Sequence, residues 1–217
     1  MVILLVALFI CALVHLSAIA AVGAMLGVPI QTFSLGFGPA LYIRGKIRIG
    51  LVPSGGSVKF LDTRNTGVPE DQMHRAFDQQ SLPKQIAICL SGCVAVAGLS
   101  LALSGQAAWG EMASAPYQFF AGALSPFDQA QRLISAGRTF IQNSGFLAVL
   151  SVVAAKLCAL NAMPLTYLNG GDAVAAIGRH IRLTRWWPKQ AALLLYFVLC
   201  GTFLLWVLAI VSYALST

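Results

Sequence analysis

The sequence contains few charged residues, and acids are especially scarce. Of its 217 residues, 14 are Lys or Arg and 7 are Asp or Glu, so charged side chains make up 10% of the chain. Soluble domains hold about 25% charged residues. This scarcity excludes an ordinary soluble domain, and the mean hydropathy of +0.79 indicates a chain embedded in a membrane.

Four long runs are almost free of charge, and each is long enough to cross a bilayer, which takes roughly 20 mainly apolar residues. The first run lacks the basic segment of a signal peptide and exceeds its apolar core of about 7–15 residues, so we predict a retained span. The sequence predicts one α-helical, polytopic membrane domain, 1–217, with four transmembrane helices at about 2–26, 86–103, 146–168 and 191–215.

The distribution of Lys and Arg predicts the orientation. Positive loops stay in the cytoplasm, and the cations gather in the first connection, which has seven, and the third, which has four. The second connection has only Arg132 and Arg138, so we predict that both termini lie outside. The net charge of +7 then indicates contact with anionic lipid and needs no nucleic acid.

Disulfide bonds are not expected, because the cysteines all lie in the apolar runs, whereas disulfide frameworks belong to small secreted domains. Cys89 and Cys93 are four residues apart and share a helix face. With His15 they form a candidate soft-metal site; alternatively they are small residues at a helix contact, which membrane packing favours. We prefer the packing interpretation. The cysteines are Cys11, Cys89, Cys93, Cys158 and Cys200.

The first connection predicts β-structure rather than an ordinary loop. Residues 30–60 are rich in glycine and β-formers, and Arg44, Gly45 and Lys46 form a short turn signal between two apolar stretches. We predict a membrane-associated β-hairpin over 30–60, with a second glycine turn at 54–56. Lipid cannot satisfy open strand edges, so this region must be buried in protein or lie at the interface.

Two helices outside the spans are also predicted. An amphipathic helix at about 126–142 begins at Ser125, with Pro126 in its first turn, and would lie on the outer face. A cytoplasmic interfacial helix at about 172–187 would be capped by Asp172. It carries Arg179, Arg182 and Arg185 at intervals of three residues, and Trp186 and Trp187 suit the headgroup level.

Several motifs in order resemble the site-2 proteases, the bacterial intramembrane zinc metalloproteases. Residues 33–42 (FSLGFGPALY) and 51–60 (LVPSGGSVKF) match the family's β-region, and 77–96 resembles its second span with the preceding helix. Residues 160–171 (LNAMPLTYLNGG) match its third-span element Asn-x-x-Pro-x-x-x-Leu-Asp-Gly-Gly. The resemblance implies a multi-pass protein of the bacterial inner membrane. The connection 105–145 is too short for the PDZ domain that many members carry.

The chain departs from this family at its chemical residues. In His-Glu-x-x-His, two histidines bind zinc and the glutamate is the general base. Here His15 stands at the first histidine, Leu16 at the glutamate and Ile19 at the second histidine, while Asn169 replaces the family's aspartate ligand. The second-span element differs as well, with Cys93 for Pro and Val96 for Asn. We therefore predict no catalytic residue, no metal and no cofactor.

Lys156 is a cation inside the third apolar run. Charges at membrane depth are costly and usually face a partner. Two alternatives are open: the side chain snorkels to the interface along its aliphatic stem, or it pairs with a carboxylate of another chain.

These observations favour a catalytically inactive relative that binds integral membrane proteins within a hetero-oligomeric complex. Relatives of this family hold an extended substrate against the β-region, so strand addition near 44–52 is the predicted mode, with Ile47, Ile49, Lys156 and Asn161 as contacts. One alternative is a protease rebuilt around His15 and Asn169 with Cys93 or Asp172. A second, an ion or small-molecule conduit, is disfavoured because only His15 and Lys156 are ionisable within the spans.

Overall fold

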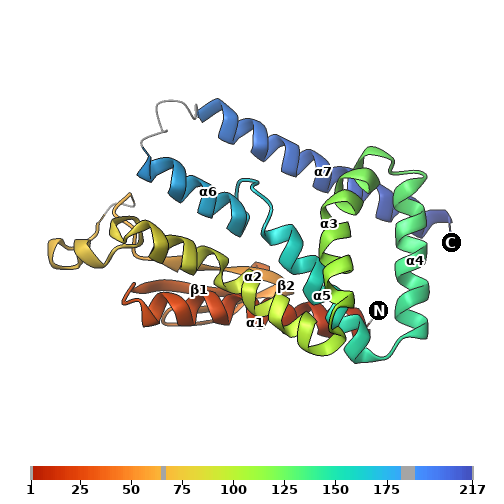
Figure 1. Ribbon diagram of the computed structural model, residues 1–217, viewed down its shortest axis with the longest axis horizontal. Coiled ribbons are helices and arrows are strands. Elements are labelled where there is room, and N and C mark those ends of the chain that lie inside the picture. Colours follow the sequence, from red (N-terminus) through yellow and green to blue (C-terminus); the bar gives the residue numbers. More distant parts are fainter. Residues whose placement is uncertain (1, 65–66, 182–188, 217) are drawn as a thin grey trace.

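The computed structural model describes residues 2–64, 67–181 and 189–216, most of them helical (Figure 1). A two-stranded sheet follows the first helix. The elements are α1 (Val2–Met25), β1 (Ile30–Arg44), β2 (Ile47–Phe60), the short 3-10 helices η1 (Glu70–Arg75) and η2 (Phe77–Gln79), α2 (Leu82–Ser104), α3 (Ala107–Leu124), α4 (Gln129–Asn143), α5 (Phe146–Asn161), α6 (Asn169–His180) and α7 (Lys189–Ser216).

Within the described residues, three helices are long and apolar enough to cross a membrane: α1, α2 and α7. Helix α5 has 16 residues, or about 24 Å at 1.5 Å per residue, and ends before the expected 168 because Pro164 follows within a turn and cannot continue a helix. The chain is thus a multi-pass membrane protein, and the four-span count remains a prediction.

The connection between α2 and α5 contains two helices where one was predicted. Helix α4 corresponds to the expected helix at 126–142 but begins at Gln129, while α3 was not predicted. Pro116 lies inside α3 and a run of small residues precedes it, a pattern that resembles a loop. Trp206 of α7 donates a hydrogen bond from Nε1 to Phe119 O at 2.8 Å, so the last helix packs against α3.

Strands β1 and β2 form a bent antiparallel hairpin beside α1 with its turn at Gly45, as predicted (Figure 1). The pairing reverses along β2. The register pairs Ile47 with Phe33, Ile49 with Leu35 and Val52 with Phe37, and then Gly56 with Leu35, Val58 with Phe33 and Phe60 with Ile30. The chain therefore turns back between Val52 and Gly56, where the second glycine turn was predicted.

The core is formed by small side chains where α1, α2 and α5 meet. Ala7 and Cys11 of α1, Val96 of α2, and Val149 and Ala154 of α5 form one buried cluster. Nearby, Ser100 of α2 donates from Oγ to the Ser151 carbonyl of α5 at 2.9 Å. Without a hydrophobic driving force between helices in lipid, close packing and such hydrogen bonds hold spans together.

Helix α6 begins at Asn169, three residues before the predicted start, so Asp172 lies in its first turn rather than at its cap. Gly170 and Gly171 allow the preceding loop to fold onto this first turn, because a Cβ at either position would overlap a carbonyl oxygen, of Ala162 or of Leu165. The predicted contacts of Arg182, Arg185, Trp186 and Trp187 lie outside the described residues.

Replacing Gly170 with Ala is expected to destabilise the protein by about 1–3 kcal/mol, since the added methyl group forces the loop away from α6. The measurement is thermal unfolding of the purified protein in detergent. Gly178 lies on the same helix with open space around it, so Gly178→Ala is the matched control and should be neutral or slightly stabilising. Equal effects of the two substitutions would contradict the tight packing of the loop.

Candidate functional site

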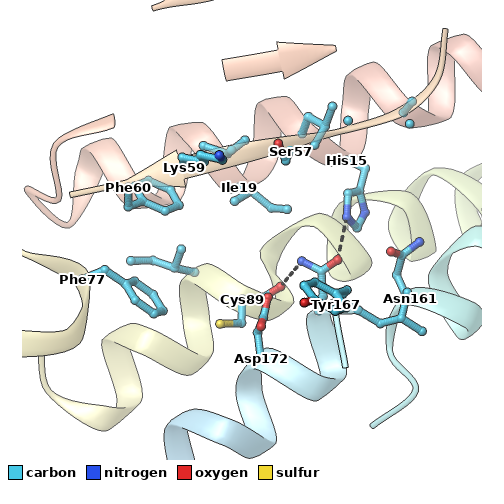
Figure 2. A pocket seen from close by; sticks show the side chains of 18 of the residues that line it. His15, Ile19, Ser57, Lys59, Phe60, Phe77, Cys89, Asn161, Tyr167 and Asp172 are labelled. Atoms are coloured by element: carbon cyan, nitrogen blue, oxygen red, sulfur yellow. Dashed lines mark hydrogen bonds between the residues drawn. The ribbon is translucent and has the colours of Figure 1, made fainter. Parts of the chain in front are cut away.

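A cavity of about 620 Å³ lies between α1, β2, α2 and the start of α6. Figure 2 shows His15 and Ile19 reaching it from α1, Ser57, Lys59 and Phe60 from β2, and Cys89 from α2. The loop that leads into α6 closes another wall. The cavity's lining thus combines segments that are more than 150 residues apart in sequence, such as His15 and Asn169.

A short chain of hydrogen bonds ends in this cavity. His15 Nε2 lies 3.0 Å from Asn169 Oδ1, and Asn169 donates from Nδ2 to the backbone oxygen of Cys89 at 2.8 Å (Figure 2). Because the Asn169 oxygen can only accept, His15 carries its proton on Nε2. These contacts fix both side chains to each other and to α2.

The imidazole of His15 lies directly on Gly92 of α2. A Cβ at Gly92 would stand 2.7 Å from His15 Cε1, so a larger residue there would displace the ring. His15 is only 6% exposed, and its Nδ1 has no hydrogen-bond partner among the described residues. The structure therefore keeps this histidine buried at one wall of the cavity, with Gly92 supplying the space.

The residues at this wall do not fit a zinc ion. Leu16 and Ile19 line the same cavity and carry no donor atom, while Asn169 is a neutral amide that already bonds His15. Zinc sites in proteins use three or four thiolate, imidazole or carboxylate ligands. No group of three such side chains is within reach of a common ion in residues 2–64, 67–181 and 189–216.

The two neighbouring cysteines occupy different places. Cys89 lines the cavity, whereas Cys93 is buried outside its lining. Cys89 and Cys93 therefore do not converge with His15 on the cavity. The packing interpretation of this pair agrees with their burial between helices.

The polar end of the cavity carries ionisable side chains from three elements. Asp62 holds Arg64 through two hydrogen bonds, which raise the pKa of the Arg64 guanidinium. The Asp172 side chain on α6 is exposed to solvent, but the protein around it desolvates the carboxylate and raises its pKa, and the nearby cations Arg179 and Arg64 partly oppose that shift. Lys59 on β2 adds a further cation. Charged side chains thus gather at one end of the cavity.

The β-sheet contributes to the cavity through residues 55–60. The register leaves the outer side of 56–60 without a partner strand in the described chain, so this edge faces the cavity with open backbone groups. Ile47 and Ile49 lie elsewhere: each pairs on both sides, Ile47 with Phe33 and Arg44, and Ile49 with Leu35 and Tyr42. Strand addition thus has no open edge at Ile47 and Ile49, although both side chains are exposed.

Lys156 finds its counter-charge inside the chain, which differs from both predicted alternatives. Its Nζ lies 2.7 Å from Glu111 Oε2 on α3 and also donates to Ser114 Oγ at 2.8 Å and Gln118 Oε1 at 2.9 Å. The acid was missed because α3 was not predicted. Asn161 lines the cavity, but Lys156 does not.

Asp78 accepts hydrogen bonds from the loop beside the cavity, and its pKa leads us to expect that the stability of the fold depends on pH. Although partial burial raises its pKa, hydrogen bonds from Thr63 and Gln79 outweigh this and lower the pKa below the usual range. A depressed pKa stabilises the fold above the unfolded value, near 3.8, and this contribution is lost as pH falls through the folded value. Thermal stability should therefore drop below about pH 4, and Asp78→Asn should flatten this part of the profile. An unchanged profile would contradict the role of Asp78.

Comparison with known proteins gives a consistent result. Residues 3–208 match the family model described as peptidase family M50. The regulator of sigma-E protease RseP of Escherichia coli K12 is 40% identical over 74 residues, which are 32% of this chain and 16% of that protein. The regulator of sigma E protease of Haemophilus influenzae is 34% identical over 74 residues, 32% of this chain and 17% of the relative. The aligned part of the chain thus spans about a sixth of the length of these relatives.

Proposed function

This chain belongs to peptidase family M50, and on that premise we propose that it is a catalytically inactive member that binds other integral membrane proteins. Its setting would be a hetero-oligomeric complex of the bacterial inner membrane, with both termini outside. The observation that carries the proposal is a contrast within one cavity of about 620 Å³: its wall brings His15, Leu16, Ile19 and Asn169 together, yet these four side chains provide one imidazole, one amide and no carboxylate.

Loss of hydrolysis follows from the identity of these four side chains. Hydrolysis on a zinc centre needs a metal held by several ligands and a carboxylate that takes a proton from the attacking water. Leu16 has no proton acceptor, and the Asn169 amide is engaged by His15 and Cys89. His15 Nε2, which would need a free lone pair to bind a metal, is hydrogen-bonded to Asn169 Oδ1 instead.

Partner binding is supported by the open strand edge at 56–60. An extended segment placed beside this edge would continue the sheet through backbone hydrogen bonds, which give affinity with little dependence on sequence. The same segment would pass Asn161 and Tyr167, which line the opposite side of the cavity (Figure 2). We therefore propose the contact at 56–60 in place of Ile47 and Ile49, because the backbone at those two residues is paired on both sides.

A photo-reactive amino acid at Ser57, which is exposed and lines the cavity, should crosslink to a membrane protein in intact membranes. The matched control is the same amino acid at Ser135, an exposed residue of α4 outside the cavity. Crosslinks are detected as bands of raised mass and identified by mass spectrometry. Labelling at Ser135 equal to that at Ser57, or no protein crosslink at Ser57, would refute the proposal.

The alternative, a protease with a rebuilt centre, is tested by elemental analysis of the purified protein. About one zinc per chain that is lost when His15 is replaced by Ala would favour the protease. We consider this alternative because the relatives are named as proteases. In the inactive protein, zinc content should be the same before and after His15→Ala.

A further inference from the structure

The outer part of the sheet, residues 38–52, exposes apolar side chains with cations between them; we refer to it as the outer hairpin. Arg44, Lys46 and Arg48 are all exposed, and there is no Asp or Glu between residues 30 and 61. Its exposed apolar residues are Leu41, Tyr42, Ile43, Ile47, Ile49, Leu51 and Val52.

Both faces of the outer hairpin are uncovered. Neighbouring side chains on a strand point to opposite faces, and the consecutive residues Leu41, Tyr42 and Ile43 are 66%, 46% and 68% exposed. A contiguous apolar surface of this kind is rare on the water-facing part of a protein. The exposed apolar side chains of the outer hairpin are more stable in the hydrocarbon region of a membrane or at its boundary than in water.

The register fixes the level of the outer hairpin along α1. Phe60 packs on Gly23, and a Cβ at Gly56 would stand 2.6 Å from Leu16, so the sheet runs beside the last third of α1. The hairpin turn pairs at the level of Phe33, between these two anchors. Leu16 and Gly23 are seven residues apart, which is roughly 10 Å along a helix. The turn of the outer hairpin therefore lies within about 10 Å of the end of α1, and the long aliphatic parts of Lys and Arg at this turn can bring their charged groups to that end.

The backbone also requires a polar environment at this level. Residues 40–44 pair with 47–50 on one side and with no described residue on the other. Hydrocarbon cannot satisfy such an open edge, whereas headgroups and their water can. Arg48 already donates from Nη2 to Gly38 O at 3.1 Å, so its guanidinium group lies against the backbone of the outer hairpin.

Charge selects among the possible occupants. Arg44, Lys46 and Arg48 form no ion pair within the described chain. A second copy would bring the same three cations against them, whereas anionic headgroups complement them. We propose that the outer hairpin docks on the phosphate groups of anionic lipids, as a surface distinct from the partner-binding cavity.

The test uses the full chain in nanodiscs of phosphatidylcholine alone or mixed equally with phosphatidylglycerol. Lipids retained after release into the gas phase are counted by native mass spectrometry. Each cation near an anionic surface contributes roughly fivefold in affinity, so Arg44→Gln with Lys46→Gln should lower the preference for phosphatidylglycerol roughly 25-fold. The charge-preserving pair Arg44→Lys with Lys46→Arg should keep it.

The matched control removes two exposed cations elsewhere, with Lys84→Gln and Arg138→Gln, and should change the preference by less than about twofold. An equal loss in both double variants, or no preference in the unaltered protein, would overturn the proposal. Competition by millimolar inorganic phosphate would indicate a free-anion site, and a dimeric mass that vanishes with Arg44→Gln would indicate a second copy. Either outcome would overturn it as well.

Discussion

Zinc at close to one ion per chain is the expected content of a variant that carries Ile19→His and Asn169→Asp, where the unaltered protein should hold none at this site. Ile19 and His15 lie one helical turn apart and line the same cavity. His15 Nε2 stands 3.0 Å from Asn169 Oδ1, close to the about 3.4 Å that separates two ligand atoms about 2.1 Å from a tetrahedral zinc. The backbone would need little movement to bind the ion.

Metal content is measured by elemental analysis after dialysis against zinc and then against buffer. Ile19→His alone is the matched control and should retain much less zinc, because the Asn169 amide remains a poor ligand. Adding Leu16→Glu should restore the base without changing the zinc content. A double variant that folds, as judged by its thermal transition, yet binds no zinc would show that the ligand positions of the family have moved apart.

Lys156→Met is expected to lower stability by about 2–3 kcal/mol and to loosen α3 from α5. The substitution leaves Glu111 without its cation and removes three hydrogen bonds to α3. Breaking a fully buried ion pair costs about 3–5 kcal/mol. We expect a smaller loss here because the two side chains are 24% and 42% exposed, so that water screens their charges. Since α7 packs mainly on α3 and α4, its attachment should weaken too.

Unfolding in detergent and hydrogen exchange of α3 and α7 are the measurements. Lys156→Arg keeps the charge and should retain most of the stability, and Glu111→Gln together with Lys156→Met should cost less than the sum of the two single changes. Additive effects would show that the ion pair contributes nothing. Loss of a membrane partner with unchanged stability would return Lys156 to an intermolecular role.

Much of the fold was predictable because it depends on local composition. The apolar runs predicted α1, α2 and α7, because uncharged stretches of this length are stable in a bilayer and unfavourable in water. Glycines at 45, 55 and 56 located both reversals of the sheet. The site was predictable to the level of His15, Leu16, Ile19 and Asn169 at one wall of a cavity, because their spacing in the sequence follows that of a known family.

Other features were missed because weak local signals were decided by distant contacts. Helix α3 contains Pro116 and several small residues, so its pattern resembles a loop, and it is held by Lys156 of α5 and Trp206 of α7. Helix α6 begins earlier than predicted because Gly170 and Gly171 let the preceding loop fold onto its first turn. Spacing along the chain does not encode such packing.

The sequence by itself determined that the chain lies in a membrane, that it carries a hairpin after its first helix, and that His15, Leu16, Ile19 and Asn169 stand at the positions of the zinc-site motif. These follow from residue identity and short spacings. Only the tertiary structure decided that Asn169 binds His15, that Lys156 pairs with Glu111, and that residues 56–60 rather than Ile47 and Ile49 form the open edge at the cavity. The physical reason is that each joins segments far apart in sequence, whose meeting depends on how the helices and the sheet pack.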